Sequence, residues 1–213
     1  MNRTAVLILF KADQRKSRLS LVLDLNQRRR LAELMFADVL GVFRRAGLLP
    51  TCYVISSDVT ALTIARRLGA QTIAEHVDKG VNAAVGTGMR TLGRGRDFMV
   101  VPSDLPLITP AEVKTALSLK RCFGCVISPS HSFDGTNLLI FSGNAAPALS
   151  YDSDSFWNHV GGAARKGLSL AVYCSDGVLS DVDTPEDLRA LSRTRKRVAS
   201  ARFAREALKK RAS

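Results

Sequence analysis

The sequence lacks the features of a membrane or secreted protein. A membrane-spanning helix requires roughly 18 to 20 uninterrupted apolar residues. No apolar run in this sequence of 213 residues is that long. The opening segment, MNRTAVLILFKADQ, has only a short apolar run and no small-residue cleavage site, so it does not fit a signal peptide. We therefore expect a cytoplasmic protein with no membrane partner.

Cysteine and histidine are also scarce. Cys52 and Cys174 lie in apolar runs typical of strands, where cysteine behaves as a small hydrophobe. Cys122 and Cys125 have CxxC spacing, but no second pair stands at zinc-site spacing, which favours buried free thiols. The three histidines are His76, His131 and His159, for which surface or core roles are favoured.

The net charge of +12 is concentrated at one end of the chain. Nine Lys or Arg residues against one acid between Arg193 and Arg211 contribute +8, which leaves +4 for the rest. A terminal basic run is usually a solvated helical extension or a disordered arm, with anion binding as the alternative. We therefore predict a domain over residues 1–191 and a basic helical or disordered tail over 192–213, and we disfavour nucleic acid as a partner.

Apolar, strand-like runs alternate with segments of helical periodicity. The nearly continuous run at 4–10 is typical of a strand covered on both faces. Further strands are predicted at 51–56, 71–74 and 98–101, and helices at 28–46, 58–68 and 82–92. This alternation predicts parallel strands joined by crossover helices.

The pattern changes in the second half of the chain. Thr109 and Pro110 signal the start of a helix, and 125–128 is typical of a strand. The turn signal Asp134-Gly135 before the apolar run 138–141 predicts a hairpin or an antiparallel strand. Later elements are predicted at 155–165, 169–173, 179–182 and from Thr184 onward. The fold class is therefore α/β, a three-layer sandwich with a mostly parallel central sheet and one antiparallel strand.

The loop after the first strand, residues 11–19, contains no glycine. A dinucleotide-binding turn or a P-loop would need glycines there, so both are disfavoured. The loop instead carries Lys11, Arg15, Lys16 and Arg18 beyond the carboxyl end of a strand, where open α/β sheets bind ligands. This predicts neutralisation of a triphosphate, although the loop taken alone would equally suit a solvated basic segment.

Three aspartates complement this positive charge. Asp104 follows the strand at 98–101, where it could cap a turn or hold a metal ion. Asp181 and Asp183 are two apart on an extended segment, so both can face one site while Val182 packs into the core. Three hard carboxylates without a histidine or thiolate cluster favour Mg²⁺ held jointly by protein and phosphate.

Lysines for a triphosphate and carboxylates for magnesium together indicate phosphoryl or nucleotidyl transfer. An acceptor that is itself a phosphate is already ionised at neutral pH and needs no general base. The scarcity of histidine agrees with such an acceptor.

An ordered set of segments resembles the 2-phospho-L-lactate guanylyltransferase family over residues 6–191. The segments are Lys11 with 16–19 (KSRL), 80–84 (GVNAA), 102–107 (PSDLPL), 134–137 (DGTN) and 181–185 (DVDTP). The resemblance implies a GT-A-like nucleotidyltransferase fold. It also implies transfer of GMP from GTP to 2-phospho-L-lactate, phosphoenolpyruvate or 3-phospho-D-glycerate with release of pyrophosphate, in the biosynthesis of the deazaflavin coenzyme F-420.

Carried over residue by residue, the resemblance implies a role for each matching position. Lys11, Lys16 and Arg18 would bind the GTP phosphates and act in catalysis, with Asn82 and Ser103 also in the nucleotide site. The Mg²⁺ ligands would be Asp104, Asp181 and Asp183. Thr136 and Ser155 would hold the acceptor, roles that are compatible with a hairpin position and a helix cap.

One segment departs from the family pattern. The family usually shows FGxxSF, whereas residues 151–156 read YDSDSF, so Asp152 replaces the glycine and Asp154 adds an acid. Extra negative charge beside an anionic acceptor is expected to change how it is held. The sequence leaves open which phosphoacid is the acceptor and whether the chain forms a homodimer.

Two rival interpretations remain. One keeps the fold but takes molybdopterin or a sugar phosphate as acceptor; such enzymes often have the glycine-rich first loop that is absent here. The other is a nucleic-acid-binding protein that uses the basic tail. Truncation after Ser192 would abolish the function of the second kind of protein, whereas we expect a transferase to lose little turnover.

Overall fold

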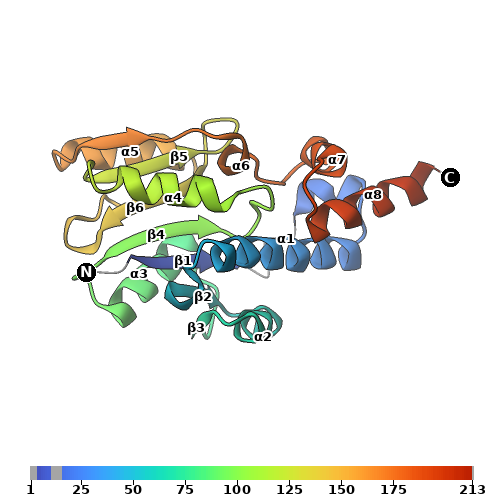
Figure 1. The fold of residues 1–213 in the computed structure, drawn as a ribbon, viewed down its shortest axis with the longest axis horizontal. Coiled ribbons are helices and arrows are strands. Elements are labelled where there is room, and N and C mark those ends of the chain that lie inside the picture. The colour runs from blue at the N-terminus through green and yellow to red at the C-terminus, as the bar shows by residue number, and fades with distance from the viewer. Residues whose placement is uncertain (1–3, 11–15, 213) are drawn as a thin grey trace.

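The structure is a computed structural model, and it describes residues 4–10 and 16–212. A seven-stranded sheet occupies the centre of this part of the chain, in the order β3-β2-β1-β4-β6-β5-β7 (Figure 1). The strands are β1 (Ala5–Leu9), β2 (Cys52–Ser56), β3 (Gln71–Ala74), β4 (Asp97–Pro102), β5 (Cys125–Pro129), β6 (Thr136–Ser142) and β7 (Leu170–Val172). β6 runs antiparallel to both β4 and β5, while the other described pairs are parallel. The predicted sheet is confirmed.

Helices cover both faces of the sheet and extend past one of its edges (Figure 1). One face packs against α1 (Leu25–Arg45), α2 (Val59–Leu68), α4 (Pro110–Leu119) and the short α6 (Asp176–Leu179). The other face packs against α3 (Val81–Leu92) and α5 (Ser155–Arg165). α7 (Pro185–Arg193) and α8 (Ala199–Ala212) lie beside the part of α1 that projects beyond the sheet. Three short 3-10 turns complete the description, η1 (Ser17–Leu21), η2 (Leu49–Thr51) and η3 (Gly143–Ala145).

The continuous apolar character of β1 reflects burial on both faces. Val6 and Ile8 belong to the cluster under α1, whereas Leu7 belongs to the cluster under α3, because successive side chains of a strand point to opposite faces. Gly88 lets α3 approach the sheet closely, since a Cβ there would lie 2.8 Å from the Cδ1 atom of Ile55. Two well-filled layers therefore fix the position of the sheet and its edges.

Several helices begin at the caps that the sequence predicts. The Thr109 side chain accepts a hydrogen bond from the backbone N–H of Glu112, and the Glu112 side chain accepts one in return from the backbone of Thr109. Thr184 and Asp187 form the same reciprocal capping box at the start of α7. Such caps stabilise a helix by typically ~1 kcal/mol and fix where it starts.

Two local predictions need correction. Residues 179–182 were expected to be extended, but helix α6 ends at Leu179 and irregular chain follows it. Helix α6 is held against α4, because Glu112 accepts a hydrogen bond from the backbone N–H of Gly177 at 2.9 Å. Among the cysteines, Cys122 and Cys174 are exposed rather than buried. Cys52 and Cys125 are buried as predicted, and burial raises the pKa of their thiols to about 12 and about 11.

The basic C-terminal segment is packed against the domain. Residues 199–212 form helix α8, one of the two forms that the sequence allows, but its alanine face is not solvated. Ala201, Ala204 and Ala207 are buried in one apolar cluster with Leu31 and Met35 of α1. Burial of this small-residue stripe means that α8 is part of the fold and not an independent arm.

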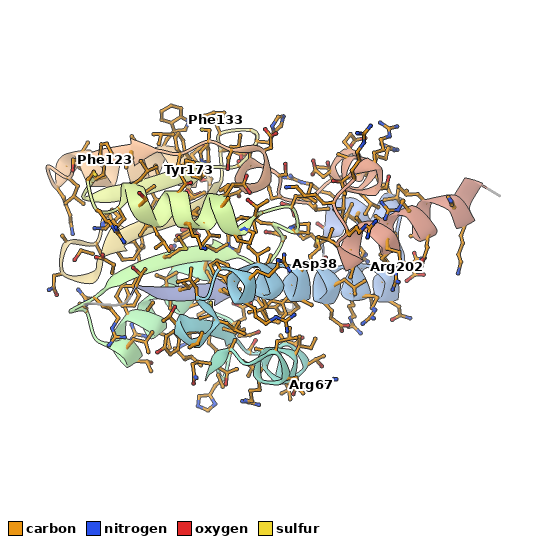
Figure 2. The ribbon with its side chains drawn as sticks, viewed as in Figure 1. Asp38, Arg67, Phe123, Phe133, Tyr173 and Arg202 are labelled. Carbon is orange, nitrogen blue, oxygen red and sulfur yellow. The ribbon has the colours of Figure 1, made fainter. Side chains whose placement is uncertain are left out.

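Asp38 of α1 fastens the start of α8 (Figure 2). Its carboxylate accepts hydrogen bonds from the backbone N–H groups of Ala199 and Ser200, at 3.0 and 2.9 Å, and from the Ser200 hydroxyl at 2.7 Å. Negative charge at a helix N-terminus also complements the helix dipole.

Within the described residues, no helix is long and apolar enough to span a membrane.

Asp38→Ala is expected to lower the free energy of unfolding by about 1–3 kcal/mol, because the N-terminal groups of α8 lose their acceptor. Urea denaturation followed by circular dichroism measures this change. Arg202→Ala, on the exposed side of the same helix, is the control and should change stability by less than about 0.5 kcal/mol. Equal denaturation midpoints for the two variants would contradict the proposed anchor.

Candidate active site

Chain segments distant in sequence meet at the carboxyl edge of the sheet. β1 and β4 end side by side there, with Leu9 paired to Pro102. Because β6 is antiparallel, its first residue, Thr136, lies at this same edge beside Pro129, the last residue of β5. The backbone N–H of Val182 donates a hydrogen bond to the carbonyl of Asp104 at 3.2 Å. This contact places the segment before α7 against the turn after β4.

Lys16 joins these segments through two ion pairs. Its ammonium donates to Oδ2 of Asp104 at 2.6 Å and also to Oδ1 of Asp183. Burial alone would lower the pKa of Lys16, but the two carboxylates outweigh it and raise the pKa above its ordinary value. Lys16 is therefore charged at neutral pH and supplies the cation that the sequence predicts opposite the aspartates.

Asp181 approaches the same centre from the other side of Val182. Its Oδ1 accepts a hydrogen bond from Asn137 Nδ2 at 3.0 Å, and Asn137 also donates to the carbonyl of Val178 at 2.9 Å. Burial raises the pKa of Asp181, the bond from Asn137 opposes this, and the negative charges of Asp104 and Asp183 raise the pKa further. The three acids therefore interact electrostatically, with Lys16 between two of them.

The carboxylates suit a divalent cation in charge and chemistry. Oδ1 of Asp104 is buried without a hydrogen-bond partner, while its Oδ2 contacts Lys16. Carboxylate oxygens are the ligands that Mg²⁺ prefers. The described part of the chain contains no three acidic, histidine or cysteine side chains already grouped as a metal site. The assignment of Asp104, Asp181 and Asp183 to Mg²⁺ therefore stays a prediction.

For the other predicted nucleotide-site residues, the described structure gives no hydrogen bond or ion pair with Lys16 or the three aspartates. Lys11 lies outside the described residues. Arg18 is exposed on η1, and Ser103 is half-buried in the turn directly before Asp104. Asn82 lies at the start of α3, where its Oδ1 accepts from the backbone N–H of Tyr151 at 2.9 Å and its Nδ2 donates to Asp152 at 3.2 Å. Asn82, which is predicted to lie in the nucleotide site, thus contacts the segment 151–156 that departs from the family pattern.

Thr136 and Ser155, the predicted acceptor residues, are buried and in contact. The Ser155 hydroxyl donates to Oγ1 of Thr136 at 3.1 Å, and Oγ1 lies 3.0 Å from Nδ1 of His159. Burial lowers the pKa of His159 to about 4, so the ring is neutral at pH 7. The sequence favoured a surface or core role for His159, and its burial agrees with a core role. The contact with Thr136 was not predicted, although His159 lies four residues after Ser155 on one helix, which places the two side chains on the same face.

A third apolar cluster lies beneath the charged residues. It contains Leu19, three residues after Lys16, and Val182, which separates Asp181 from Asp183. These two side chains pack with buried residues of α1, α7 and α8. Lys196, between α7 and α8, also donates to the carbonyl of Leu107 at 2.5 Å, in the loop that carries Asp104. The C-terminal segment therefore supports both the basic and the acidic side of the site.

The sheet order and the charged carboxyl edge define an α/β protein of the nucleotidyltransferase fold class. A protein of Desulfovibrio desulfuricans G20 assigned as a nucleotide-diphospho-sugar transferase superposes with a TM-score of 0.78, covering 99% of this chain and 98% of that chain at 19% identity. A cytidylyltransferase from Leptospira borgpetersenii gives a TM-score of 0.61, covering 100% and 96% at 14% identity. At these identities the likeness shows the fold alone.

The chain belongs to the family described as "Guanylyl transferase CofC like", whose model matches residues 4–208. It is 35% identical over 173 residues to a 2-phospho-L-lactate guanylyltransferase of Methanocaldococcus infernus, covering 81% of this chain and 76% of that protein. It is 38% identical over 180 residues to a phosphoenolpyruvate guanylyltransferase of Rubrobacter xylanophilus, covering 83% and 86%. The family resemblance is confirmed.

The packing of α8 revises the expectation that truncation after Ser192 leaves turnover intact. We now expect the truncated chain to lose at least about 100-fold of its guanylyl transfer activity, because Leu19 and Val182 lose part of their packing and Leu107 loses its tether. Replacing the exposed Arg202 and Lys210 by Gln is the control and should keep kcat within about twofold. Full turnover by the truncated chain would contradict a supporting role for α8.

Proposed function

We propose that this chain transfers GMP from GTP to a small phosphorylated acid and releases pyrophosphate, in a magnesium-dependent reaction that serves coenzyme F-420 biosynthesis. Family membership and the names of the matched relatives support the reaction. The structural observation that carries the proposal is Lys16 paired with Asp104 and Asp183 at the carboxyl edge of the sheet. Neither transfer to molybdopterin or a sugar phosphate nor nucleic-acid binding gains support from these observations.

The reaction joins two anions. A phosphate oxygen of the acceptor bonds to the α-phosphorus of GTP, and the bond from that phosphorus to the oxygen bridging the β-phosphate breaks. The electron pair leaves with pyrophosphate, and no proton has to be removed from an ionised acceptor. Catalysis then depends on orientation and on positive charge near the phosphates, which Lys16 supplies.

The charges of Lys16 and the aspartates suggest how the site would accept its substrates. The buried ammonium is balanced by two carboxylates, so a phosphate group can compete for it only if those carboxylates gain another cation. Asp104, Asp181 and Asp183 would hold Mg²⁺, which when bound supplies further positive charge for phosphate oxygens. Thr136 and Ser155 would hold the acceptor.

We expect purified protein with GTP, Mg²⁺ and one of 2-phospho-L-lactate, phosphoenolpyruvate or 3-phospho-D-glycerate to release pyrophosphate, with CTP as the comparison nucleotide. Asp104→Asn should lower kcat by at least about 100-fold, because it removes a carboxylate proposed to hold Mg²⁺ and one of the two groups that position Lys16. Asp97→Asn, at the opposite end of β4 and paired with Lys120 at 3.6 Å, is the matched control and should keep near-normal turnover. No pyrophosphate from any combination would overturn the proposed function.

Asp152 gives a separate prediction about the acceptor. Removing its charge should raise kcat/KM for the anionic acceptor by about 3- to 10-fold at low salt, with a smaller effect at high salt. Asp152→Gly restores the family residue, while Asp152→Asn removes the charge and keeps a side chain that can bond to Asn82. Both should behave alike if charge is the cause, and unchanged kcat/KM in both variants would show that Asp152 does not act on the acceptor.

A further inference from the structure

The hydrogen bonds around His159 determine which of its nitrogen atoms carries a proton. The backbone N–H of Ser150 donates to Nε2 at 3.1 Å, so Nε2 must be the unprotonated nitrogen. The neutral ring then carries its proton on Nδ1, which lies 3.0 Å from Oγ1 of Thr136. His159 is therefore a donor to Thr136 and an acceptor from Ser150.

This arrangement fills the acceptor capacity of Thr136. Its Oγ1 receives one hydrogen bond from His159 and a second from the Ser155 hydroxyl at 3.1 Å. A hydroxyl oxygen has two lone pairs, so its own proton is left to be donated elsewhere. If the bond between Thr136 and Ser155 ran in the opposite direction, the proton left over would be that of Ser155. In either case, the pair keeps one hydroxyl donor.

The other tautomer would remove that donor. With the proton on Nε2, the ring could not accept from Ser150, and Nδ1 would take a hydrogen bond from the Thr136 hydroxyl. Burial of His159, at 1% exposure, makes an unsatisfied donor or acceptor costly and so favours the tautomer that satisfies every group. The Tyr151 ring, 4.6 Å from the His159 ring in an edge-on contact, helps to hold its orientation.

We propose that His159 is a positioning residue, which keeps one hydroxyl proton of the Thr136 and Ser155 pair available to an oxyanion of the phosphoacid. This role rests on the proposed function, because it assumes that these two residues hold the acceptor. The same ring fixes the backbone at Ser150, next to Tyr151 and Asp152, which Asn82 holds from α3. His159 thus orients the acceptor hydroxyls and the adjoining segment without touching the reacting atoms.

Three substitutions at His159 separate this role from simple core packing. His159→Asn keeps an N–H donor near the position of Nδ1, His159→Gln keeps an acceptor near Nε2, and His159→Leu keeps neither. We expect Asn to leave the KM for the phosphoacid within about threefold of the wild type. Gln and Leu should raise it about 10- to 100-fold, because without the donor on Nδ1 the two hydroxyls are free to rotate and their spare proton is no longer held towards the oxyanion. A lost hydrogen bond to a charged group corresponds to one or two factors of ten. The KM for GTP should stay within about threefold in all three variants.

Thermal denaturation shows whether each variant is folded, and the comparison of Asn with Gln remains decisive if Leu unfolds. The tautomer can be measured directly in the wild-type protein from the ¹⁵N chemical shifts of the His159 ring, and a proton on Nε2 would overturn the proposal. An active wild type whose folded Asn and Gln variants show equal phosphoacid KM values would also overturn it while leaving the proposed function intact. Silence of the wild type with every acceptor would instead overturn the proposed function and this role together.

Discussion

The ion pairs of the buried Lys16 ammonium are the interaction on which the site depends. A buried ammonium is costly unless opposite charge lies beside it, and Asp104 and Asp183 provide that charge from two other segments of the chain. The same pairs keep like-charged carboxylates together at the edge of the sheet. The third apolar cluster stabilises this arrangement, because Leu19 and Val182 pack against the same helices. Lys16 lies three residues before Leu19, and Asp181 and Asp183 flank Val182. Charge pairing and apolar packing therefore support one geometry.

The antiparallel strand β6 gives the site its second half. In a fully parallel sheet, every strand ends at the carboxyl edge and none begins there. The antiparallel β6 begins at this edge, with Thr136 and Asn137. Asn137 holds Asp181 on the charged side, and Thr136 contacts Ser155 and His159 on the other side. Two adjacent residues of one strand therefore link the proposed metal and acceptor regions. The irregular register where Ser128 and Pro129 pair with the start of β6 places Asn137 on the side of α6 and Thr136 on the side of α5.

The elements predicted most closely are those with strong local patterns. Gln71–Ala74 and Ser155–Arg165 match their predicted ranges, and Thr109 and Thr184 cap the expected helices, because periodicity and capping depend on neighbouring residues. The packing of α8 was missed because its stripe of alanines is inconspicuous within a strongly basic segment. Helix α6 was missed because its tether to Glu112 is a tertiary contact. The link between His159 and Thr136 was missed because a buried histidine is ordinarily a core residue.

The sequence by itself determined the alternation of strands and helices, the antiparallel insertion, the helix caps and the family resemblance. Each of these depends on short segments of neighbouring residues and on the order in which those segments follow one another. Only the tertiary structure decided which charges pair, which tautomer His159 adopts and where the basic helix packs. Lys16 is 88 residues from Asp104 and 167 from Asp183, so no local pattern relates them. Their contact arises because crossover connections bring strand ends to one edge and apolar packing then holds the intervening chain in place.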